Sequence, residues 1–400
     1  MYSIFKKNFS KSVVIVNGKR TAIGSFMGKI SGVQAPLLGS ACIDGALQAS
    51  KINKEEVNEV IMGNVLSAGL GQAPARQAAI KAGLLPSTVC TTVNKVCSSG
   101  MKAVMLGAQS ILLNDHEIVV AGGFENMSLA PHYSYLRKQF TYGNPVSYDS
   151  IILDGLTNSF DGKAMGVCAE KTVKDLKLGR AESDEYCIQS YERTLNAQKK
   201  GFFQKEIVTI SYEVQKGKKE NFNEDEEPSR FKRDKIPSLT PVFEKDGTVT
   251  AANASKINDG ACALVLMDEE LASKRNLRAI ARIVGYADSE IDPIDFSIAP
   301  SSAVNRLLKK CNKSIKDIDY FEFNEAFSCV SLANMKLLGL NSSKVNLHGG
   351  AVALGHPIGA SGARIILSLI NVLQENNGKY GIAAICNGGG GASSIMVERL

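Results

Sequence analysis

The second half of this 400-residue chain repeats the order of the first half. Apolar stretches that predict strands alternate with helical stretches over the first 130 residues, and the same order returns from about residue 276. Residues 55–64 resemble residues 315–324, and Cys97 and His356 follow these segments by 33 and 32 residues. Coincidence between two alternating segments is the alternative interpretation. A duplication predicts an α/β protein in which two largely parallel sheets are covered by helices.

The duplication also predicts where distant residues meet. Ligands of parallel sheets gather at the carboxyl ends of the strands. If a pseudo-twofold axis relates the halves, equivalent loops bring Cys97, Asn324, His356 and Cys386 to one site.

The middle of the chain departs from the alternating pattern. Residues 124–245 are richer in polar residues, tyrosine and charge than the flanking segments. We therefore predict three parts: an N-terminal half formed by residues 1–123 and 246–275, an inserted loop domain of residues 124–245, and a C-terminal half of residues 276–400. The length of the insertion favours a function, such as covering a substrate.

Two cysteines and a histidine lie among glycines and small residues. Cys97 precedes a helix predicted over residues 100–113, whose N-terminus would favour the thiolate. His356 lies in a glycine-rich turn, and Cys386 precedes four glycines. Glycines let a bulky thioester approach the backbone and free amide groups to bind an oxyanion. The pattern indicates acyl transfer through a cysteine, whereas core packing or turn capping is the alternative for each residue alone.

Asn324 ends a predicted strand and opens a predicted helix. Its side-chain amide would fix a water molecule in an oxyanion hole, or it would cap the helix.

Composition argues against several other classes. With 44% apolar and 22% charged residues, the chain is typical of an ordinary globular protein, and its apolar stretches are too short to span a bilayer. Nine cysteines without a CxxC pair, and four histidines without ligand spacing, indicate neither a disulfide framework nor a transition-metal site. Basic and aromatic residues are not interleaved, which argues against nucleic-acid binding.

The motifs together resemble the thiolase family, and within it most closely the group that acts on acetoacetyl-CoA. The resemblance covers residues 12–400, and its motifs are residues 71–77, 121–128, 253–260, 324–328, 349–362 and 386–391. It implies two βαβαβαββ halves in a five-layered αβαβα arrangement, with an inserted loop domain.

The resemblance also implies a reaction. His356 would deprotonate Cys97, which would accept an acetyl group from one acetyl-CoA, and Cys386 would remove the alpha proton of a second. The amides of Cys97 and Gly388 would form one oxyanion hole, and His356 with a water bound to Asn324 the other. The product is acetoacetyl-CoA, and thiolysis is the reverse.

Further expectations about ligands follow from the same resemblance. It assigns coenzyme A binding to Met165, Tyr191, Arg230, Phe231, Lys232, Lys235 and Ser255. It assigns a potassium ion to Tyr191 and the carbonyls of Ala251, Ala252, Ala254 and Val352. No covalently bound cofactor is expected. The expected assembly is a homotetramer to which part of residues 127–143 contributes.

The first dozen residues are basic and rich in hydroxyl groups, which is typical of a short mitochondrial targeting segment or of a cytoplasmic tail. Two other functions stay open at this point. One is a broad-chain 3-ketoacyl-CoA thiolase of fatty-acid degradation, and the other is a non-catalytic acyl-CoA or lipid carrier.

Overall fold

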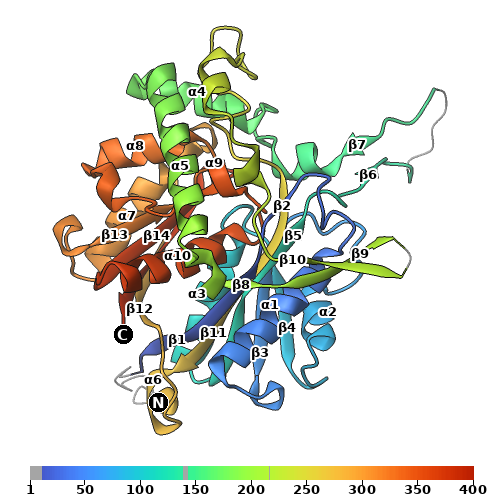
Figure 1. Ribbon diagram of the computed structural model, residues 1–400, viewed down its shortest axis with the longest axis vertical. Coiled ribbons are helices and arrows are strands. Elements are labelled where there is room, and N and C mark those ends of the chain that lie inside the picture. The colour runs from blue at the N-terminus through green and yellow to red at the C-terminus, as the bar shows by residue number, and fades with distance from the viewer. Residues whose placement is uncertain (1–10, 138–142, 216) are drawn as a thin grey trace, which may run out of the picture.

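The two halves of the chain have the same element order in the computed structural model, which describes residues 11–137, 143–215 and 217–400 (Figure 1). The N-terminal half contains β1 (Val13–Thr21), α1 (Ala35–Ser50), β3 (Glu59–Gly63), α2 (Pro74–Lys81), β4 (Val89–Val93), α3 (Ser99–Leu112), β5 (Ile118–Asn126) and β11 (Asn258–Asp268). The C-terminal half contains β12 (Ala281–Glu290), α7 (Ala299–Lys310), β13 (Tyr320–Phe323), α8 (Ser328–Leu338), α9 (Ala351–Leu354), α10 (Ser361–Glu375), β14 (Tyr380–Asn387) and β15 (Gly391–Arg399).

The strand order is symmetric about the junction of the halves. It runs β13-β14-β15-β12-β1-β11-β5-β3-β4, so that β1 and its counterpart β12 pair in the middle of one continuous sheet. They pair antiparallel, with Val13 opposite Ile283. The counterpart of β4 is reduced to one parallel bridge between Phe321 and Val345. The duplication predicted from the sequence is therefore present in the fold.

The sheet is mixed, so the prediction of largely parallel sheets was wrong for part of each half. Strands β4, β3 and β5 pair in parallel, as do β13 and β14. The last two strands of each half, β5 with β11 and β14 with β15, run antiparallel to each other. In the C-terminal half the reason is the short connection from β14 to β15 through Gly388–Gly390, because a hairpin joins only antiparallel strands.

Five layers are stacked, as the resemblance predicted. Helices α1 and α2 cover one outer face, and α7 and α8 cover the other (Figure 1). Helices α3 and α10 lie between the two halves of the sheet, in a core cluster built from strands of both halves. The inserted segment adds α4 (Met165–Leu176) and α5 (Arg180–Lys199), which pack on α8 and α9.

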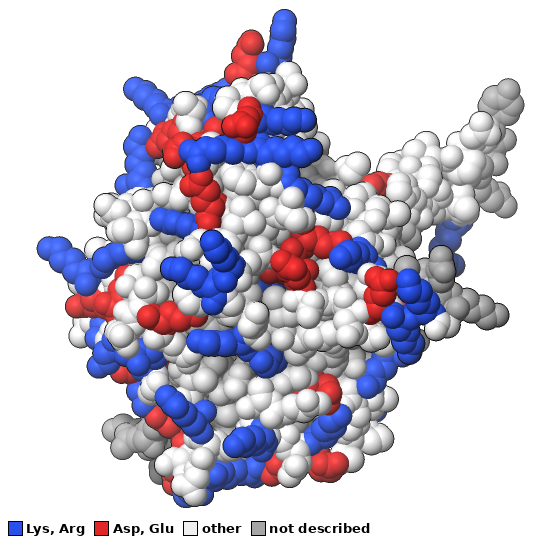
Figure 2. All heavy atoms as spheres, in the orientation of Figure 1, with Lys and Arg blue, Asp and Glu red and all other residues white. Residues whose placement is uncertain are grey.

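Smaller elements complete the chain: β2 (Gly24–Ser25), β6 (His132–Tyr133), β7 (Tyr148–Asp149), β8 (Ile207–Val208), β9 (Ile210–Gln215), β10 (Lys218–Phe222) and α6 (Glu269–Lys274). The pair β6 and β7 forms an arm that extends from the body (Figure 1). Within the described residues, no helix has the length and apolar character needed to cross a membrane. Figure 2 shows basic and acidic side chains interspersed over one face.

One glycine of β5, Gly123, marks the contact between the halves. The strand runs through Gly122 and Gly123 and continues to Asn126. A Cβ atom on Gly123 would lie 2.0 Å from the carbonyl oxygen of Gly359, in the loop that follows His356. Gly123 therefore allows the close approach of the C-terminal half.

We expect Gly123→Ala to lower the free energy of unfolding by about 1–3 kcal/mol, because the added methyl group collides with a backbone carbonyl that has no free space to move into. Urea unfolding followed by circular dichroism measures the change. Gly32→Ala is the matched control, since no atom lies within 4 Å of its added Cβ. Equal midpoints for the two variants would contradict the close contact.

Candidate active site

Cys97 lies in a strained loop between β4 and α3. The preceding residue, Val96, has a φ of 46°, in the left-handed region that β-branched residues avoid. Hydrogen bonds hold this turn: the Val96 amide donates to Asn94 Oδ1 at 2.9 Å, and the Lys95 amide donates to Ser99 Oγ at 2.8 Å. The strain turns the chain sharply before α3 and leaves Cys97 partly exposed beside a cavity.

The Cys97 thiol is held in its neutral form. Burial raises its pKa to about 12, although two backbone amides, those of Gly388 and of Cys97 itself, oppose the rise by pointing at the sulfur. The helix N-terminus therefore does not make a resting thiolate. The same two amides form a cradle for negative charge next to the sulfur, at the positions predicted for an oxyanion hole.

His356 lies between α9 and α10 as a neutral base. Its Nδ1 is 2.6 Å from Ser361 Oγ, which donates its own proton to the Pro357 carbonyl at 3.0 Å. The imidazole therefore carries its proton on Nδ1, and Nε2 is free to accept one. Burial, together with the charge of Arg364, lowers the pKa of His356 to about 3. Its amide donates to Asn258 Oδ1 at 3.0 Å, which positions the loop.

Asn324 follows β13 and faces His356. Its Nδ2 lies 3.4 Å from His356 Nε2, and its Oδ1 accepts a hydrogen bond from Arg364 at 3.3 Å. Arg364 thus sets the orientation of the amide, with the donor group turned toward the histidine. The sequence analysis missed Ser361, Arg364 and Asn258, because neither their type nor their spacing distinguishes them from ordinary helix and strand residues.

Cys386 is buried near the end of β14. Burial raises its pKa well above the usual value, and the nearby Cys97 raises it further, because two thiolates at this site would repel each other. It packs in a cluster with Met165, Phe296 and Phe327. Ser98 donates to the Ile385 carbonyl at 3.3 Å and contacts Asn387 Oδ1 at 2.9 Å, which ties the start of α3 to the end of β14.

A cavity of about 390 Å³ lies beside Cys97 and His356, and neither Asn324 nor Cys386 is among its lining residues. Cys97, His356 and Gly388 line it, together with residues of the inserted segment and of the loop before β11. Its wall also includes Met127, Ile152, Gly155, Leu156, Thr157, Ala164, Met165, Gly166, Phe243, Ala254, Ser255, Lys256, Ile257, Phe296, Ala326, Phe327 and Ile358. This mainly apolar cavity, with a thiol, a neutral imidazole and converging amides, is suited to acyl transfer.

Comparisons with known proteins agree with this geometry. The N-terminal domain of thiolase matches residues 13–270, and the C-terminal domain of thiolase matches residues 277–399. The chain belongs to the thiolase family. A crystal structure of a thiolase from Ascaris suum in complex with coenzyme A superposes with a TM-score of 0.92 at 44% identity, covering 98% of this chain and 100% of that one.

Curated relatives of this thiolase extend over nearly its whole length. It is 49% identical to the mitochondrial acetyl-CoA acetyltransferase of Homo sapiens, over 100% of this chain and 93% of that protein. It is also 49% identical to the acetyl-CoA acetyltransferase of Saccharomyces cerevisiae, over 98% of this chain and 100% of that protein.

The residues predicted to bind coenzyme A lie in two places. Met165 and Ser255 line the cavity. Tyr191 is buried and stacks on Phe231, with ring centroids 4.7 Å apart. The side chains predicted for the phosphates, Arg230, Lys232 and Lys235, are exposed. Arg230 pairs with Glu227 at 3.7 Å.

The potassium site predicted from the resemblance does not fit the structure. The ammonium group of Lys256 donates hydrogen bonds to three of the four carbonyls that were assigned to the ion, those of Ala252, Ala254 and Val352. It also lies 5.5 Å from the centre of the Tyr191 ring. A potassium ion would share these oxygens with a positive charge, so the residues present do not fit the ion that the resemblance implies.

Two buried glutamates hold the loops around the site and were also missed. Glu125 accepts hydrogen bonds from the amides of Val65 and Gly359, both at 3.0 Å, and burial raises its pKa to about 7. Glu325 accepts from Ser190 at 2.7 Å and from the Val352 amide at 3.0 Å. Glu125 lies inside the motif of residues 121–128 and Glu325 inside the motif of residues 324–328, so their positions in these motifs could have indicated their roles.

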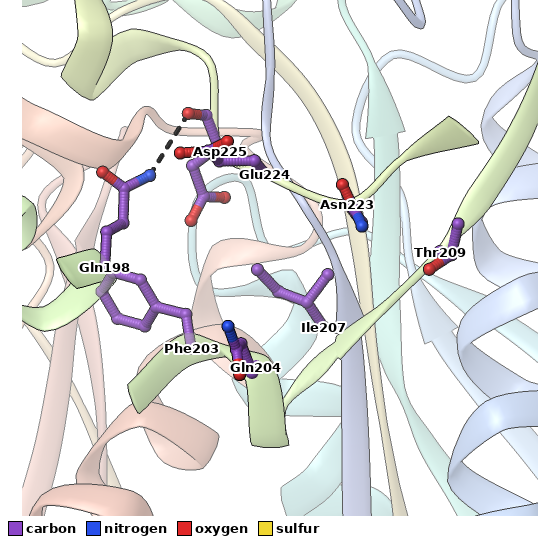
Figure 3. Close-up of a pocket in the computed structure, with 8 residues that line it drawn as sticks. All are labelled: Gln198, Phe203, Gln204, Ile207, Thr209, Asn223, Glu224 and Asp225. Atoms are coloured by element: carbon purple, nitrogen blue, oxygen red, sulfur yellow. Dashed lines mark hydrogen bonds between the residues drawn. The ribbon is translucent and has the colours of Figure 1, made fainter. Parts of the chain in front are cut away.

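A second cavity of about 400 Å³ lies apart from these residues (Figure 3). Its lining residues are Gln198, Phe203, Gln204, Ile207, Thr209, Asn223, Glu224 and Asp225. Gln198 donates to the Asp225 carbonyl at 3.4 Å, and the Asp225 carboxylate pairs with buried Arg20. Its lining includes neither a cysteine nor a histidine, so this cavity lacks the groups on which acyl transfer through a cysteine depends.

We expect alkylation of Cys97 by iodoacetamide to accelerate about tenfold for each pH unit between pH 7 and 10, because only the thiolate reacts and the thiol pKa is about 12. Mass spectrometry of the Cys97 peptide measures the rate, and Cys97→Ala reports the background from the other cysteines. A rate that levels off below pH 8 would show a thiolate paired with imidazolium instead.

Proposed function

We propose that this thiolase is an acetyl-CoA C-acetyltransferase, which condenses two acetyl-CoA molecules to acetoacetyl-CoA and coenzyme A, and runs the thiolysis in reverse. The observation that carries the proposal is the Cys97 thiol, which lies against the amides of Cys97 and Gly388 in a cavity shared with neutral His356. Relatives of this name at about 49% identity, and a related thiolase in complex with coenzyme A, support it.

In the first half-reaction, His356 Nε2 takes the proton of Cys97 as the sulfur attacks the thioester carbonyl. The two amides stabilise the oxyanion that forms, and His356 then returns the proton to the sulfur of the departing coenzyme A. The product is an acetyl group on Cys97. A neutral cysteine and histidine suit this step, because burial delays formation of the reactive thiolate until the substrate is bound.

In the second half-reaction, the Cys386 thiol gives its proton to Nε2 of His356, and the resulting thiolate removes the alpha proton of a second acetyl-CoA. A high thiol pKa suits this role, since a strong base is needed for a weak carbon acid. Asn324 and His356 provide hydrogen bonds for the enolate oxygen, directly or through a water molecule. The carbanion attacks the acetyl group, and the Cys97 thiolate that leaves takes the proton held on His356 Nε2, while Cys386 keeps the alpha proton.

The packing around Cys386 favours a short acyl group over the long chains of a broad-chain thiolase. Phe296, Phe327 and Met165 pack directly on Cys386, and Phe243 packs edge-on against Phe327. An acyl chain longer than acetoacetyl would have to displace the buried ring of Phe296 and the partly buried rings of Phe327 and Phe243. A non-catalytic carrier is disfavoured, because it needs neither the second thiol nor a histidine with a free Nε2.

Coenzyme A itself would lie with its pantetheine arm in the cavity, past Met165 and Ser255, and with its phosphates toward the exposed Arg230, Lys232 and Lys235. Phe231 and Tyr191 provide a stacked aromatic pair under this basic segment. Cationic side chains of this kind suit phosphate groups.

We also propose that the protein is a homotetramer in mitochondria. The arm carries exposed apolar side chains, Leu129, Tyr135, Leu136 and Val146, which a partner subunit would cover. Light scattering would measure the molar mass.

The localisation is a separate part of this proposal. Relatives include mitochondrial and cytosolic forms. Ten residues of the targeting segment lie outside the described residues, and a fluorescent protein fused to residues 1–12 would test it.

We expect the purified protein to cleave acetoacetyl-CoA in the presence of coenzyme A, and Cys97→Ala to lose about 10³-fold or more of this activity, because the acyl-enzyme can no longer form. A long-chain 3-ketoacyl-CoA should be cleaved far more slowly. An unchanged melting temperature of the variant serves as the folding control. Cleavage by Cys97→Ala, or a preference for the long chain, would contradict the proposal.

We expect Cys386→Ala to retain acetyl transfer to Cys97 but to lose condensation, because it removes only the base for the second substrate. Incubation with acetyl-CoA should add one acetyl group to the Cys97 peptide, detected by mass spectrometry, without formation of acetoacetyl-CoA. Cys168→Ala is the matched control, since it removes a buried thiol from the same cluster. An equal loss of condensation activity in both variants would contradict a specific role of Cys386 as the base.

A further inference from the structure

Lys256 places an ammonium group among backbone carbonyls at the edge of the active-site cavity. Its Nζ donates to the carbonyl oxygens of Ala254 at 2.8 Å, Ala252 at 2.9 Å and Val352 at 3.1 Å. The face of the Tyr191 ring lies 5.5 Å away. Three carbonyl oxygens and an aromatic face are typical surroundings of a bound cation, and here the cation is the ammonium group of Lys256.

The geometry fits the charged form of the lysine. An ammonium group has three N–H donors, and each of the three carbonyls accepts one, so no donor is left over. A neutral amine would leave one carbonyl without a donor. Burial lowers the pKa of Lys256, and the negative charges of Glu227 and Glu325 oppose that effect.

The ammonium group connects two segments that shape the site. Ala254, Ser255 and Lys256 line the cavity in the loop before β11. Val352 belongs to α9, which ends two residues before His356. Lys256 is the only side chain among the described residues that donates to carbonyls of both segments. It therefore fixes the distance between the wall that faces the thioester and the loop that carries the base.

We infer that Lys256 is a tethered cation that replaces potassium in this thiolase and makes its stability and activity independent of that ion. The ammonium ion and potassium are close in size and share a preference for oxygen donors. A tethered cation differs from a dissolved one in that it is always bound, since its local concentration is set by the chain. The part of the inference that concerns activity rests on the proposed function.

The first test compares the wild-type protein in potassium, sodium and choline chloride at equal ionic strength. We expect the same melting temperature and the same kcat/KM for acetoacetyl-CoA cleavage in all three salts. Stimulation of the wild-type protein by potassium, in either readout, would overturn the inference.

The second test removes the tethered cation. Lys256→Ala leaves the carbonyls of Ala254 and Val352 without their donor, while the Ala252 carbonyl keeps the Cys187 thiol at 3.3 Å, and it creates an opening the size of the lost side chain. We expect a lower melting temperature and a kcat/KM about tenfold lower in sodium chloride, mainly through a higher KM, because the cavity wall is displaced while Cys97 and His356 remain. Potassium chloride should restore both readouts in this variant, and sodium chloride should do so less.

Lys256→Met is the matched control, because it keeps most of the side-chain volume without the charge. It should be impaired like Lys256→Ala, but potassium should not restore it, since the methionine fills the opening. Failure of potassium to change either readout of Lys256→Ala would overturn the inference, as would full activity of Lys256→Met. The melting temperatures need no substrate, so an inactive protein with the expected salt dependence would refute the proposed function and leave the tethered cation standing.

Discussion

The close contact between the first turns of α3 and α10 is the constraint on which the rest of this thiolase depends. A Cβ atom on Gly362 would lie 2.3 Å from the Met101 amide nitrogen, and one on Gly100 would lie 2.9 Å from the Gly359 carbonyl. Only residues without side chains allow the two central helices to meet this closely. Because Cys97 precedes one helix and His356 the other, this helix contact is also what brings the nucleophile and the base together.

Burial then sets the chemistry of the residues that the helices bring together. It raises the pKa of Cys97 and lowers that of His356, so both are neutral at physiological pH. Ser361 leaves Nε2 of the histidine free, and Arg364 turns the Asn324 amide toward it. The site therefore consists of neutral groups whose hydrogen-bond donors and acceptors are already oriented before a substrate binds. Negative charge develops only when the Cys97 sulfur attacks a thioester.

The loops that carry these groups are held by buried charges rather than by apolar packing alone. Glu125 binds amides from both halves, Glu325 binds the start of α9, and Lys256 binds α9 to the loop before β11. Removing any of them would leave several buried backbone groups without partners, which costs more than the loss of one contact. The network explains how loops made largely of glycine and alanine keep a defined geometry.

The sequence by itself determined the duplicated α/β fold and the identity of the chemical groups, because strand and helix periodicity and the glycine-rich motifs are local signals. Only the tertiary structure decided the mixed strand directions, the neutral state of Cys97 and His356, and the supporting roles of Ser361 and Arg364. It also showed that the ammonium group of Lys256 lies among the carbonyls of Ala252, Ala254 and Val352, because the sequence shows that Lys256 is present but not where its side chain ends. These properties depend on burial and on contacts between residues far apart in the chain, and no local pattern encodes them.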